Sequence, residues 1–450
     1  MVKNVKMPAV PNELIASFNP SALSLGRSHK TKRDALPKVD AARLKILKVR
    51  DFDRFVMLLL ATVGMVSNSQ MKALLTCVPA GKDSPIGFEG MTSDLMTRFG
   101  VTFDMRRAIG QLHNPDAAYM ALRRMAKKGL TRTVLQGQNV QVQTDLAGRG
   151  VEVAWVLTPL GAAVLLRLTT KKELTVDDLR FNIHDNRVAL ITQAHDLGVS
   201  SFLTGLCVGA AYYSNREKPI RVDVVRVVGD GKDFVMNGKK FRPDLSVVLF
   251  IQKVFVPLFI EWNNDNTTNQ NITGKAVRFQ RLMLDAPAEA WSAGRPWLIF
   301  TSPTEGRVES HEKAIREAAK RTGLLAASTY DPMDWAGIAV CTFEDLGRFS
   351  PYGAIYRLFD YSTGKLTDDK YTLVSLHRSK VAAAPVEEPR NVLPPQRTKV
   401  VKAVREEVEN GASPPEWTKS RRGAAAPLIG HIEDEAASAP LVGYVLNGGA

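Results

Sequence analysis

Apolar runs and polar turns in the second half of the chain predict a sheet flanked by helices. Leu245–Ile251 and Val254–Ile260 are nearly continuous apolar runs, typical of buried strands, and the short gap between them predicts a tight connection. The order of elements around them indicates a mixed α/β domain. We expect further strands at Val222–Val228, Trp297–Thr301 and Gly337–Thr342, and helices at Asn182–Leu197, Thr273–Ala290 and Glu309–Thr322.

The first half of the chain has helical patterns first and two short strands afterwards. An apolar helix is expected over Asp51–Gly64, and Asn68 can cap a second helix that runs to Thr76. Asn114-Pro115 can open a third helix, because Asn is a good cap and Pro fits the first helical position. This order predicts a winged helix-turn-helix, in which the third helix enters the major groove of DNA. The strands are expected at Leu130–Leu135 and Val151–Leu157, and the closing helix from Thr158 to Leu168.

The predicted third helix carries four basic side chains, which lie mostly off its apolar stripe: Arg123, Arg124, Lys127 and Lys128. A charge run on one helix face is ordinary solvated surface in many proteins, so this pattern alone leaves DNA binding open. The wing-like strands that follow and the basic excess of the chain favour contact with phosphates or base edges.

The composition divides the 450-residue chain into four segments. Residues 1–45 are polar, basic and punctuated by Pro, which predicts a disordered arm. Residues 375–450 are rich in Ala and Pro, which predicts a disordered tail. Between them we expect the winged helix at 46–170 and the α/β domain at 175–365. The expected fold class is therefore α+β with disordered termini.

The chain has a formal net charge of +14, and residues 1–50 hold 11 Lys and Arg against 3 Asp and Glu. This excess favours a polyanionic partner, which is nucleic acid or an acidic membrane surface. Leu197–Asn215 is long enough to cross a membrane, but its Gly, Ser and Thr content predicts a core element. The N-terminus lacks the pattern of a secretory signal, and the three Cys form no CxxC pair. We therefore expect a cytoplasmic protein whose partner is double-stranded or branched DNA.

Two acidic residues flank the paired apolar runs. Asp244 stands directly before the first run and Glu261 directly after the second, so an antiparallel hairpin would bring the two carboxylates side by side. Two neighbouring carboxylates can hold a Mg²⁺ that stays partly hydrated and also touches a phosphate. The pair is therefore the candidate metal site.

Pro243-Asp244, a gap of 16 residues and Glu261-Trp262-Asn263 resemble the core of the PD-(D/E)xK nucleases. Together with the helical segment ending in Lys127-Lys128-Gly129 and the helix that carries Lys275, they make the chain similar to the replication-relaxation family of bacterial plasmids and other mobile elements. The resemblance implies a winged helix followed by a restriction-endonuclease-like domain, and DNA binding in replication or mobilisation. The last motif residue of the nucleases is Lys, whereas this chain has Asn263.

The resemblance implies a role for each residue around the acids. Asp244 and Glu261 would hold Mg²⁺ or Mn²⁺, and Asn263 could orient water or bind phosphate but cannot supply positive charge. Lys275 could direct its ammonium toward the metal and replace the missing motif lysine. The same helix offers two candidates for contact with the scissile strand, Arg278 and Gln280. The implied reaction is metal-dependent cleavage or nicking of DNA.

A structural role accounts for the same residues. Asp244 would then cap a turn, and Glu261 would form a buried ion pair with Lys275 or Arg278. The alternative function is a non-catalytic replication, mobilisation or regulatory factor that binds DNA and has a degenerate nuclease fold, and Asn263 favours it.

Two further expectations concern the surroundings of the candidate site. His184 and Asp185, on the predicted first helix of the α/β domain, could supply an auxiliary acid or form an ordinary core or surface pair. A homodimer or plasmid replication and mobilisation proteins are additional candidate partners, and association with the nucleoid or a plasmid is the expected location.

Overall fold

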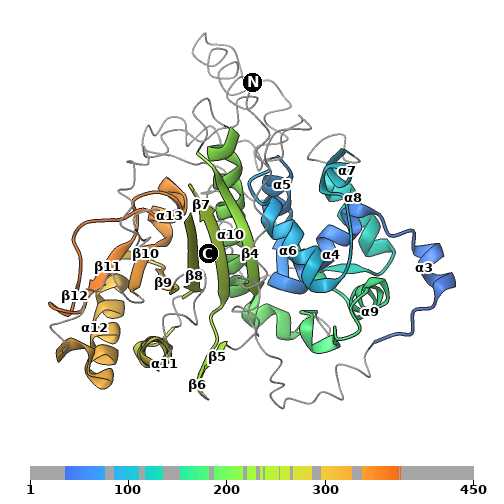
Figure 1. Cartoon of the computed structure of the whole chain (residues 1–450). Helices are drawn as coiled ribbons and strands as arrows, with labels where there is room; N and C mark the ends of the chain where they lie inside the picture. Colours follow the sequence, from blue (N-terminus) through green and yellow to red (C-terminus); the bar gives the residue numbers. More distant parts are fainter. Residues whose placement is uncertain are drawn as a thin grey trace, which may run out of the picture.

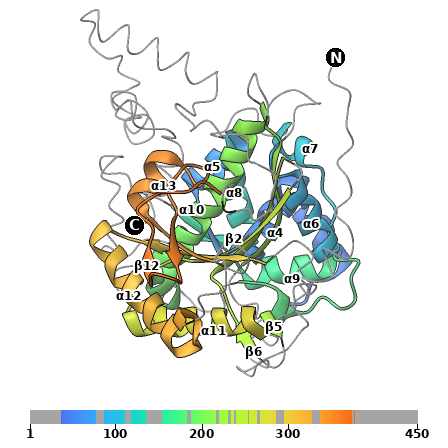
Figure 2. The ribbon, with the colours of Figure 1, turned by 60° about the vertical axis from the view of Figure 1, so that its left-hand side comes forward.

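The computed structural model shows a mixed α+β fold around a large mixed sheet. In Figures 1 and 2 the N-terminal helices lie on one side of this sheet, and α11 (Asn269–Asp285) and α12 (Glu305–Thr322) lie on the other. Most of the predicted arm and nearly all of the predicted tail lie outside the described residues. The structure describes residues 36–76, 86–110, 117–134, 153–181, 187–215, 220–229, 234–236, 239–252, 254–263, 267–285, 295–326, 337–373 and 376.

The N-terminal part combines helices with a small sheet. Its strands pair antiparallel in the order β1-β3-β2. In chain order the elements are α3 (Ala41–Leu47), α4 (Asp51–Val63), β1 (Met65–Ser67), α5 (Asn68–Thr76), α6 (Glu89–Phe99), α7 (Met105–Gly110), α8 (Ala117–Lys127), β2 (Thr131–Val134), β3 (Ala154–Leu157) and α9 (Pro159–Leu168).

Local capping sets the ends of several of these helices. In α4, Asp53 accepts a hydrogen bond from the backbone N–H of Arg50 at 3.2 Å, and Gly64 ends the helix at φ 87°. Thr158 caps α9 by accepting from the backbone N–H of Gly161 at 3.0 Å. The predicted bounds of α4, α5 and α9 are therefore confirmed to within one residue.

Other N-terminal elements differ from the prediction. α3 begins inside the segment predicted as a disordered arm, where Asp40 caps it by accepting from the backbone N–H of Arg43 at 2.7 Å. The sequence pattern predicts neither α6 nor β1. β3 begins at Ala154 rather than Val151. α6 is missed because its apolar residues are sparse among Gly, Thr, Ser and charged positions.

The large sheet has the strand order β12-β11-β10-β9-β8-β7-β4. β4, β7 and β8 are antiparallel, β9 and β10 run parallel to β8, and β11 and β12 return antiparallel. The predicted strands are confirmed, but the last predicted strand, β10, is followed by two more. The bounds are β4 (Val222–Gly229), β7 (Leu245–Ile251), β8 (Val254–Glu261), β9 (Trp297–Ser302), β10 (Ile338–Thr342), β11 (Arg357–Asp360) and β12 (Lys365–Leu366), with a separate hairpin of β5 (Phe234–Met236) and β6 (Lys239–Phe241).

Alternate residues along the strands face two hydrophobic clusters. In β7, Val247 and Leu249 pack with α10 (Arg187–Asn215) and the N-terminal helices, whereas Val248 and Phe250 pack with α11 and α12. The prediction of a mixed sheet between helices is therefore confirmed.

The N-terminal part and the sheet share one hydrophobic cluster. Leu122 of α8 and Val247 of β7 both belong to it, so the cluster continues across the boundary predicted at residues 170–175. α6 contacts β4, where the backbone N–H of Gly90 donates to the Asp223 carboxylate at 3.1 Å. A Cβ on Gly229 would lie 1.8 Å from the carbonyl oxygen of Thr62, so the end of β4 touches the backbone of α4. The two parts therefore form one packed unit.

α10 is a single helix of 29 residues. The sequence pattern predicts a helix that ends at Leu197 and a separate core element after it, and residues 182–186 lie outside the described residues. Among the described residues, the His195–Asn215 stretch is long and apolar enough to cross a membrane, but 94% of its apolar window is buried inside the protein. This burial agrees with the predicted core role.

The helices on the other face begin earlier than predicted. α11 starts at Asn269 rather than Thr273, because Thr268 accepts from the backbone N–H of Asn271 at 3.3 Å and extends the helix into the Asn-rich segment. α12 starts at Glu305 rather than Glu309. These two helices carry side chains toward the end of the sheet at which β8 and β9 finish.

Candidate active site at the end of strands β7 and β8

The antiparallel pairing of β7 and β8 brings two acids together. Leu245 pairs with Ile260, so Asp244 and Glu261 face each other directly outside that pair. The backbone N–H of Asp244 donates to Ile260 O at 3.1 Å, and the backbone N–H of Trp262 donates to Asp244 Oδ2 at 2.8 Å. The hairpin thus places both carboxylates at one end of the sheet, as the sequence indicates.

Lys275, in the second turn of α11, reaches both carboxylates. Its Nζ lies 3.2 Å from Asp244 Oδ1 and also contacts Glu261 Oε2. Asp244 is 7% exposed and Glu261 is fully buried, so the ammonium is a polar partner for two carboxyl groups that water hardly reaches. The Lys275 side chain points toward the two acids, as expected if it replaces the motif lysine. It also forms the ion pair with Glu261 that is expected from a purely structural role.

α10 contributes a histidine that the sequence pattern does not predict. His195 Nε2 lies 3.0 Å from Asp244 Oδ2, and its Nδ1 lies 3.5 Å from Asp196 Oδ1. The pair named from the sequence, His184 and Asp185, lies outside the described residues. A signal was present: His195 and Asp196 are the only Asp, Glu, His, Lys or Arg residues between positions 188 and 214. A charged pair inside an otherwise apolar helix indicates a polar neighbour in the fold.

A close contact between α10 and Trp262 positions that histidine. Gly198 follows His195 by one helical turn, and a Cβ on Gly198 would lie 2.0 Å from Nε1 of Trp262. On its other side, Trp262 stacks on Phe343 with ring centroids 4.4 Å apart and an interplanar angle of 13°. Because residue 198 has no side chain, α10 can approach the sheet closely enough for His195 to touch Asp244.

Opposing effects set the protonation of this group. Burial opposes a charge on His195, but hydrogen bonds and attraction to Asp196 and Asp244 outweigh it and raise the pKa of His195 to about 10. Burial also disfavours the Asp244 carboxylate, yet His195 and Lys275 hold the pKa of Asp244 below its usual range. Burial and the charge of Asp244 raise the pKa of Glu261, against the attraction of Lys275. At neutral pH the site therefore holds charged His195 and Lys275 beside the Asp244 carboxylate.

Asn263 lies apart from the acids, and its expected place in the site is corrected. Its Nδ2 donates to Thr301 O at 3.2 Å and lies 3.3 Å from His311 Nε2, and the residue is 2% exposed. β8 ends at Glu261, so the strand alternation that would place residues 261 and 263 on one face does not extend to Asn263. Its amide is therefore committed to a contact with β9 and α12.

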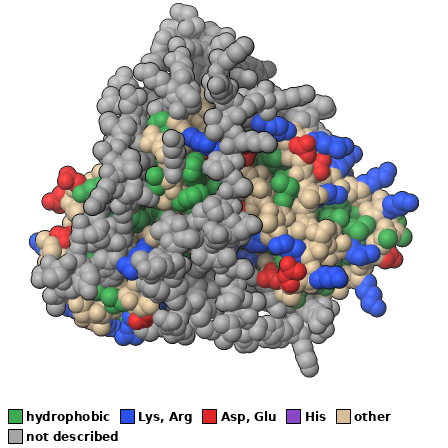
Figure 3. All heavy atoms as spheres, in the orientation of Figure 1, with side chains coloured by type: hydrophobic (Ala, Val, Ile, Leu, Met, Phe, Trp, Pro, Cys, Tyr) green, Lys and Arg blue, Asp and Glu red, His purple; other side chains and the backbone are tan. Residues whose placement is uncertain are grey.

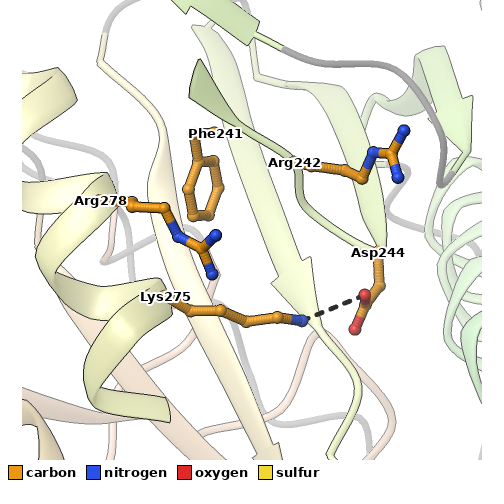
Figure 4. A pocket seen from close by; sticks show the side chains of 5 residues that line it. All are labelled: Phe241, Arg242, Asp244, Lys275 and Arg278. Carbon is orange, nitrogen blue, oxygen red and sulfur yellow. Dashed lines mark hydrogen bonds and ion pairs between the residues drawn. The ribbon is translucent and has the colours of Figure 1, made fainter. Parts of the chain in front are cut away.

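A pocket of about 270 Å³ opens beside Asp244 (Figure 4). Lys275 and Arg278 extend into it from α11, Arg242 stands on the segment between β6 and β7, and Phe241 forms part of the wall. Three cations and one carboxylate thus line a space next to the paired acids.

Gln280 does not share this pocket. Its Nε2 donates to the Tyr361 hydroxyl at 3.3 Å, its Oε1 accepts from the Thr322 hydroxyl at 3.0 Å, and it is 1% exposed. Five residues after Lys275, Gln280 is rotated by about 140° around the helix. The expectation that it contacts a scissile strand is therefore corrected, whereas Arg278, three residues after Lys275, does line the pocket.

The four cations predicted on the third helix divide into two pairs, with Lys128 lying directly after the end of α8. Arg123 and Lys127 are exposed. Arg124 and Lys128 turn toward Asp53, which is fully buried: Lys128 Nζ lies 3.0 Å from Oδ2 and Arg124 Nη2 lies 4.0 Å from Oδ1. Arg124 and Lys128 therefore hold α8 against α4, and Arg123 and Lys127 remain on the outward face.

The outward face of α8 also carries two large side chains. Tyr119 is 40% exposed and Met120 is 60% exposed, and the guanidinium of Arg123 lies 5.6 Å from the centre of the Tyr119 ring. Figure 3 shows Lys and Arg side chains gathered on the right-hand part of the molecule, where Figure 1 places N-terminal helices. Cations interleaved with an aromatic ring are suited to contact with nucleic acid.

The donor set available to a metal ion is small. Within the described residues, no group of three or more His, Cys, Asp or Glu side chains could hold a metal ion. Asp244 and Glu261 offer two carboxylates, and Glu261 Oε1 is buried without a hydrogen-bond partner. A carboxyl oxygen without a hydrogen-bond partner beside a second carboxylate fits a hard divalent cation, and entry of the cation would require Lys275 to move away from the acids.

Comparison of the chain with protein-family models, curated proteins and solved structures gave no match. The resemblance to the replication-relaxation family therefore rests on the short motifs in the sequence.

Proposed function

We propose that the protein binds DNA through α8 and hydrolyses phosphodiester bonds at the Asp244–Glu261 site. The observation that carries this proposal is the position of Lys275, which approaches both acids from the helix directly after β8. Lys275 thereby supplies the positive charge that Asn263 lacks. In PD-(D/E)xK nucleases, two acids and a lysine act together on one phosphate, so this grouping supports a hydrolytic site.

The order of elements around the site supports the same function. α10, then β4, β7 and β8, then α11 and β9 give one helix, three antiparallel strands, a crossover helix and a parallel strand. This is the order of a restriction-endonuclease-like core. The two acids stand at the start of the second core strand and the end of the third, as the nuclease motif requires.

The N-terminal elements support a winged helix. α4, β1, α5, α8, β2 and β3 follow the order helix, strand, helix, helix, strand, strand, and their strands pair as β1-β3-β2. α6 and α7 are then an insertion between the second and third helices. The third helix of such a domain enters the major groove, which assigns the exposed stripe of Arg123 and Lys127 to DNA.

The residues of the site have separate roles in this proposal. Asp244 and Glu261 would hold Mg²⁺ or Mn²⁺, which when bound supplies Lewis acidity and an activated water. Lys275 would move from the acids to the phosphate and stabilise the negative charge that develops there. His195 would stay hydrogen-bonded to Asp244, keeping that carboxylate ionised and oriented.

A plasmid-nicking assay tests the proposal. Supercoiled plasmid is incubated with Mg²⁺ or Mn²⁺ and the wild type, Asp244→Ala, Lys275→Ala, or the matched control Glu309→Ala, which removes an exposed acid of α12. We expect the wild type and the control to nick the plasmid and both site variants to lose nicking. Nicking that survives in Asp244→Ala would show that the activity belongs elsewhere.

A non-catalytic DNA-binding factor is the second candidate, and two observations favour it. Asn263 is turned away from the acids, and Lys275 with His195 balances their charge without a metal ion. Calorimetry decides between the two functions. If Mn²⁺ does not bind, or binds equally to the wild type and Glu261→Ala, the acids are a structural remnant and the protein acts by binding DNA.

A further inference from the structure

We propose that a basic surface around α3 is a second contact for duplex DNA, next to the outward face of α8. The surface consists of four exposed side chains on α3 and on the short segment between α3 and α4: Arg43, Lys45, Lys48 and Arg50. The inference deepens the proposed function and rests on it, because the partner is the DNA that α8 is proposed to bind.

α3 has an inner apolar face and an outer charged face. Leu47 is 8% exposed and belongs to the shared hydrophobic cluster, against which the partly buried Leu44 also packs. Arg43 and Lys45 are exposed, and Figure 1 places α3 at the outer edge of the N-terminal helices. The apolar side chains therefore hold the helix in place while its cations remain in contact with solvent.

A buried carboxylate places this surface beside α8. Lys128, directly after α8, donates through Nζ to Lys48 O at 3.1 Å and to Asp53 Oδ2 at 3.0 Å. The backbone N–H of Arg50 donates to the same Asp53 oxygen at 3.2 Å. Lys127, which precedes Lys128, is exposed. The segment 48–50 therefore lies at the end of α8, and the exposed cations of the two helices adjoin each other.

The charge of this part of the chain is positive. Residues 36–55 hold six Lys and Arg against three Asp. Each Asp has a contact of its own: Asp40 accepts from the backbone N–H of Arg43 at 2.7 Å, Asp51 lies 3.6 Å from Arg107, and Asp53 is buried. An excess of cations on an exposed surface favours a polyanion, because binding releases the counterions of the phosphates.

The small apolar area of α3 favours DNA over an anionic membrane, which would attract the same cations. A helix that lies on a membrane buries a whole apolar face. Within α3, all of whose residues the structure describes, Leu44 and Leu47 turn inward, and Ile46, which is 78% exposed, is the one large apolar side chain left for a membrane. Duplex DNA requires only cations at this place, since its phosphate backbone continues past the groove that α8 is proposed to enter.

Duplex binding in EDTA tests the inference. A labelled duplex is titrated with the wild type and with two triple variants that remove the same number of Lys and Arg charges. The α3 variant combines Lys45→Gln, Lys48→Gln and Arg50→Gln. The control changes three exposed cations of α12, on the other side of the large sheet, and combines Lys313→Gln, Lys320→Gln and Arg321→Gln. The unfolding temperature of each variant shows whether it is folded.

We expect the α3 variant to bind at least about tenfold more weakly than the wild type, and its dependence of log affinity on log salt to fall by about 3, one for each lost phosphate contact. The ratio of its affinities for two different duplex sequences should stay unchanged, because phosphate contacts do not read bases. The control should bind like the wild type. Unchanged affinity and salt dependence in the α3 variant would overturn the inference, and so would equal losses in the α3 variant and the control.

The double variant Arg123→Ala with Lys127→Ala, measured in the same series, separates this inference from the proposed function. If the double variant binds more weakly and the α3 variant does not, α8 contacts DNA without α3 and only the inference fails. If the wild type binds no duplex, both fail. The assay contains no metal ion, so its outcome does not depend on nicking.

Vesicles of phosphatidylserine and phosphatidylcholine in equal parts test the membrane as the partner. We expect the α3 variant and the wild type to differ in duplex binding and not in vesicle binding. Loss of vesicle binding in the α3 variant with unchanged duplex binding would assign the surface to a membrane and overturn the inference.

Discussion

Asp53 and Asp244 are both buried acids surrounded by cations, yet their surroundings differ. Asp53 lies in the first turn of α4, where it accepts from the Arg50 N–H and pairs at 3.0 Å with Lys128, the residue directly after α8. Asp244 lies at the end of the sheet, with Lys275 at 3.2 Å and a second acid, Glu261, across the hairpin. A pocket opens beside Asp244, whereas Asp53 is enclosed between two helices.

The difference shows that a buried ion pair alone does not indicate a functional site. A single acid that also caps a helix contributes to packing, and loss of either partner leaves a buried charge without compensation. Two acids placed side by side repel each other, and this repulsion lowers the stability of the fold. Such a pair is expected where a ligand binds to both carboxyl groups.

The largest expected effect concerns stability. Asp53→Ala should lower the free energy of unfolding by about 3 kcal/mol, because it removes the carboxylate that faces Lys128 and Arg124 and also a cap of α4. Glu261→Gln should leave stability nearly unchanged or raise it in the absence of metal, since it removes the repulsion with Asp244 while Lys275 keeps Asp244 as a partner. Denaturant unfolding measures both. Equal losses in the two variants would make Glu261–Lys275 a structural pair like Asp53–Lys128.

A second prediction concerns the competition between Lys275 and a metal ion. Lys275→Met removes the ammonium that contacts both acids, so Mn²⁺ should bind at least about tenfold more tightly than to the wild type, as expected from the loss of a cation at such short range. Lys313→Met, at an exposed position of α12, is the control and should leave the affinity unchanged. Titration calorimetry measures the affinities. If Mn²⁺ still does not bind after Lys275 is removed, the acids are not a metal site.

A third prediction separates the outward pair Arg123 and Lys127 from the pair Arg124 and Lys128, which contacts Asp53. Arg123→Ala with Lys127→Ala should weaken duplex binding about tenfold and reduce the dependence of log affinity on log salt by about 2, one for each lost phosphate contact. Lys128→Ala should lower stability and leave the salt dependence of the folded protein unchanged. Binding measured over a series of salt concentrations distinguishes them. A salt dependence reduced equally by Lys128→Ala would mean that the ion pair with Asp53 opens on DNA.

The smallest effect is the pH dependence of His195. Its pKa is raised from 6.5 to about 10 in the folded protein, so the folded state holds this proton more tightly than the unfolded state. The stabilisation is fully present below pH 6.5 and is lost as the pH rises through about 10. We expect the difference in unfolding free energy between the wild type and His195→Gln to shrink by on the order of 1 kcal/mol between about pH 6 and about pH 10. A difference that grows with pH would mean that His195 is neutral in the folded protein.

The sequence predicts elements whose pattern is local. β7 and β8 are confirmed almost to the residue, because each is a continuous apolar run and the pair is joined by a tight connection. α6 is missed because it is held by the sheet of the other half of the chain, through contacts such as Gly90 with Asp223. Such long-range packing has no signature in a short window of sequence.

The parts of the candidate site that depend on the periodic direction of side chains along one helix or one strand are predictable from the sequence. Asp244 and Glu261 follow from the hairpin, and a helix rotation of about 100° per residue places Arg278 near Lys275 and Gln280 away from it. This periodicity cannot show that the strand ends before Asn263 or that α10 lies against the end of the sheet. The proximity of His195 to Asp244 depends on the contact of Gly198 with Trp262, which is a property of the folded chain.

The single hydrophobic cluster that contains Leu122 of α8 and Val247 of β7 has a consequence for any DNA held by both parts. Side-chain packing, rather than a flexible linker, fixes the separation between the outward face of α8 and the pocket. The protein would then hold two points of the duplex at a fixed distance from each other. In a hydrolytic protein of this design, cuts fall at a constant offset from the contacted sequence, and lengthening a surface loop does not change that offset.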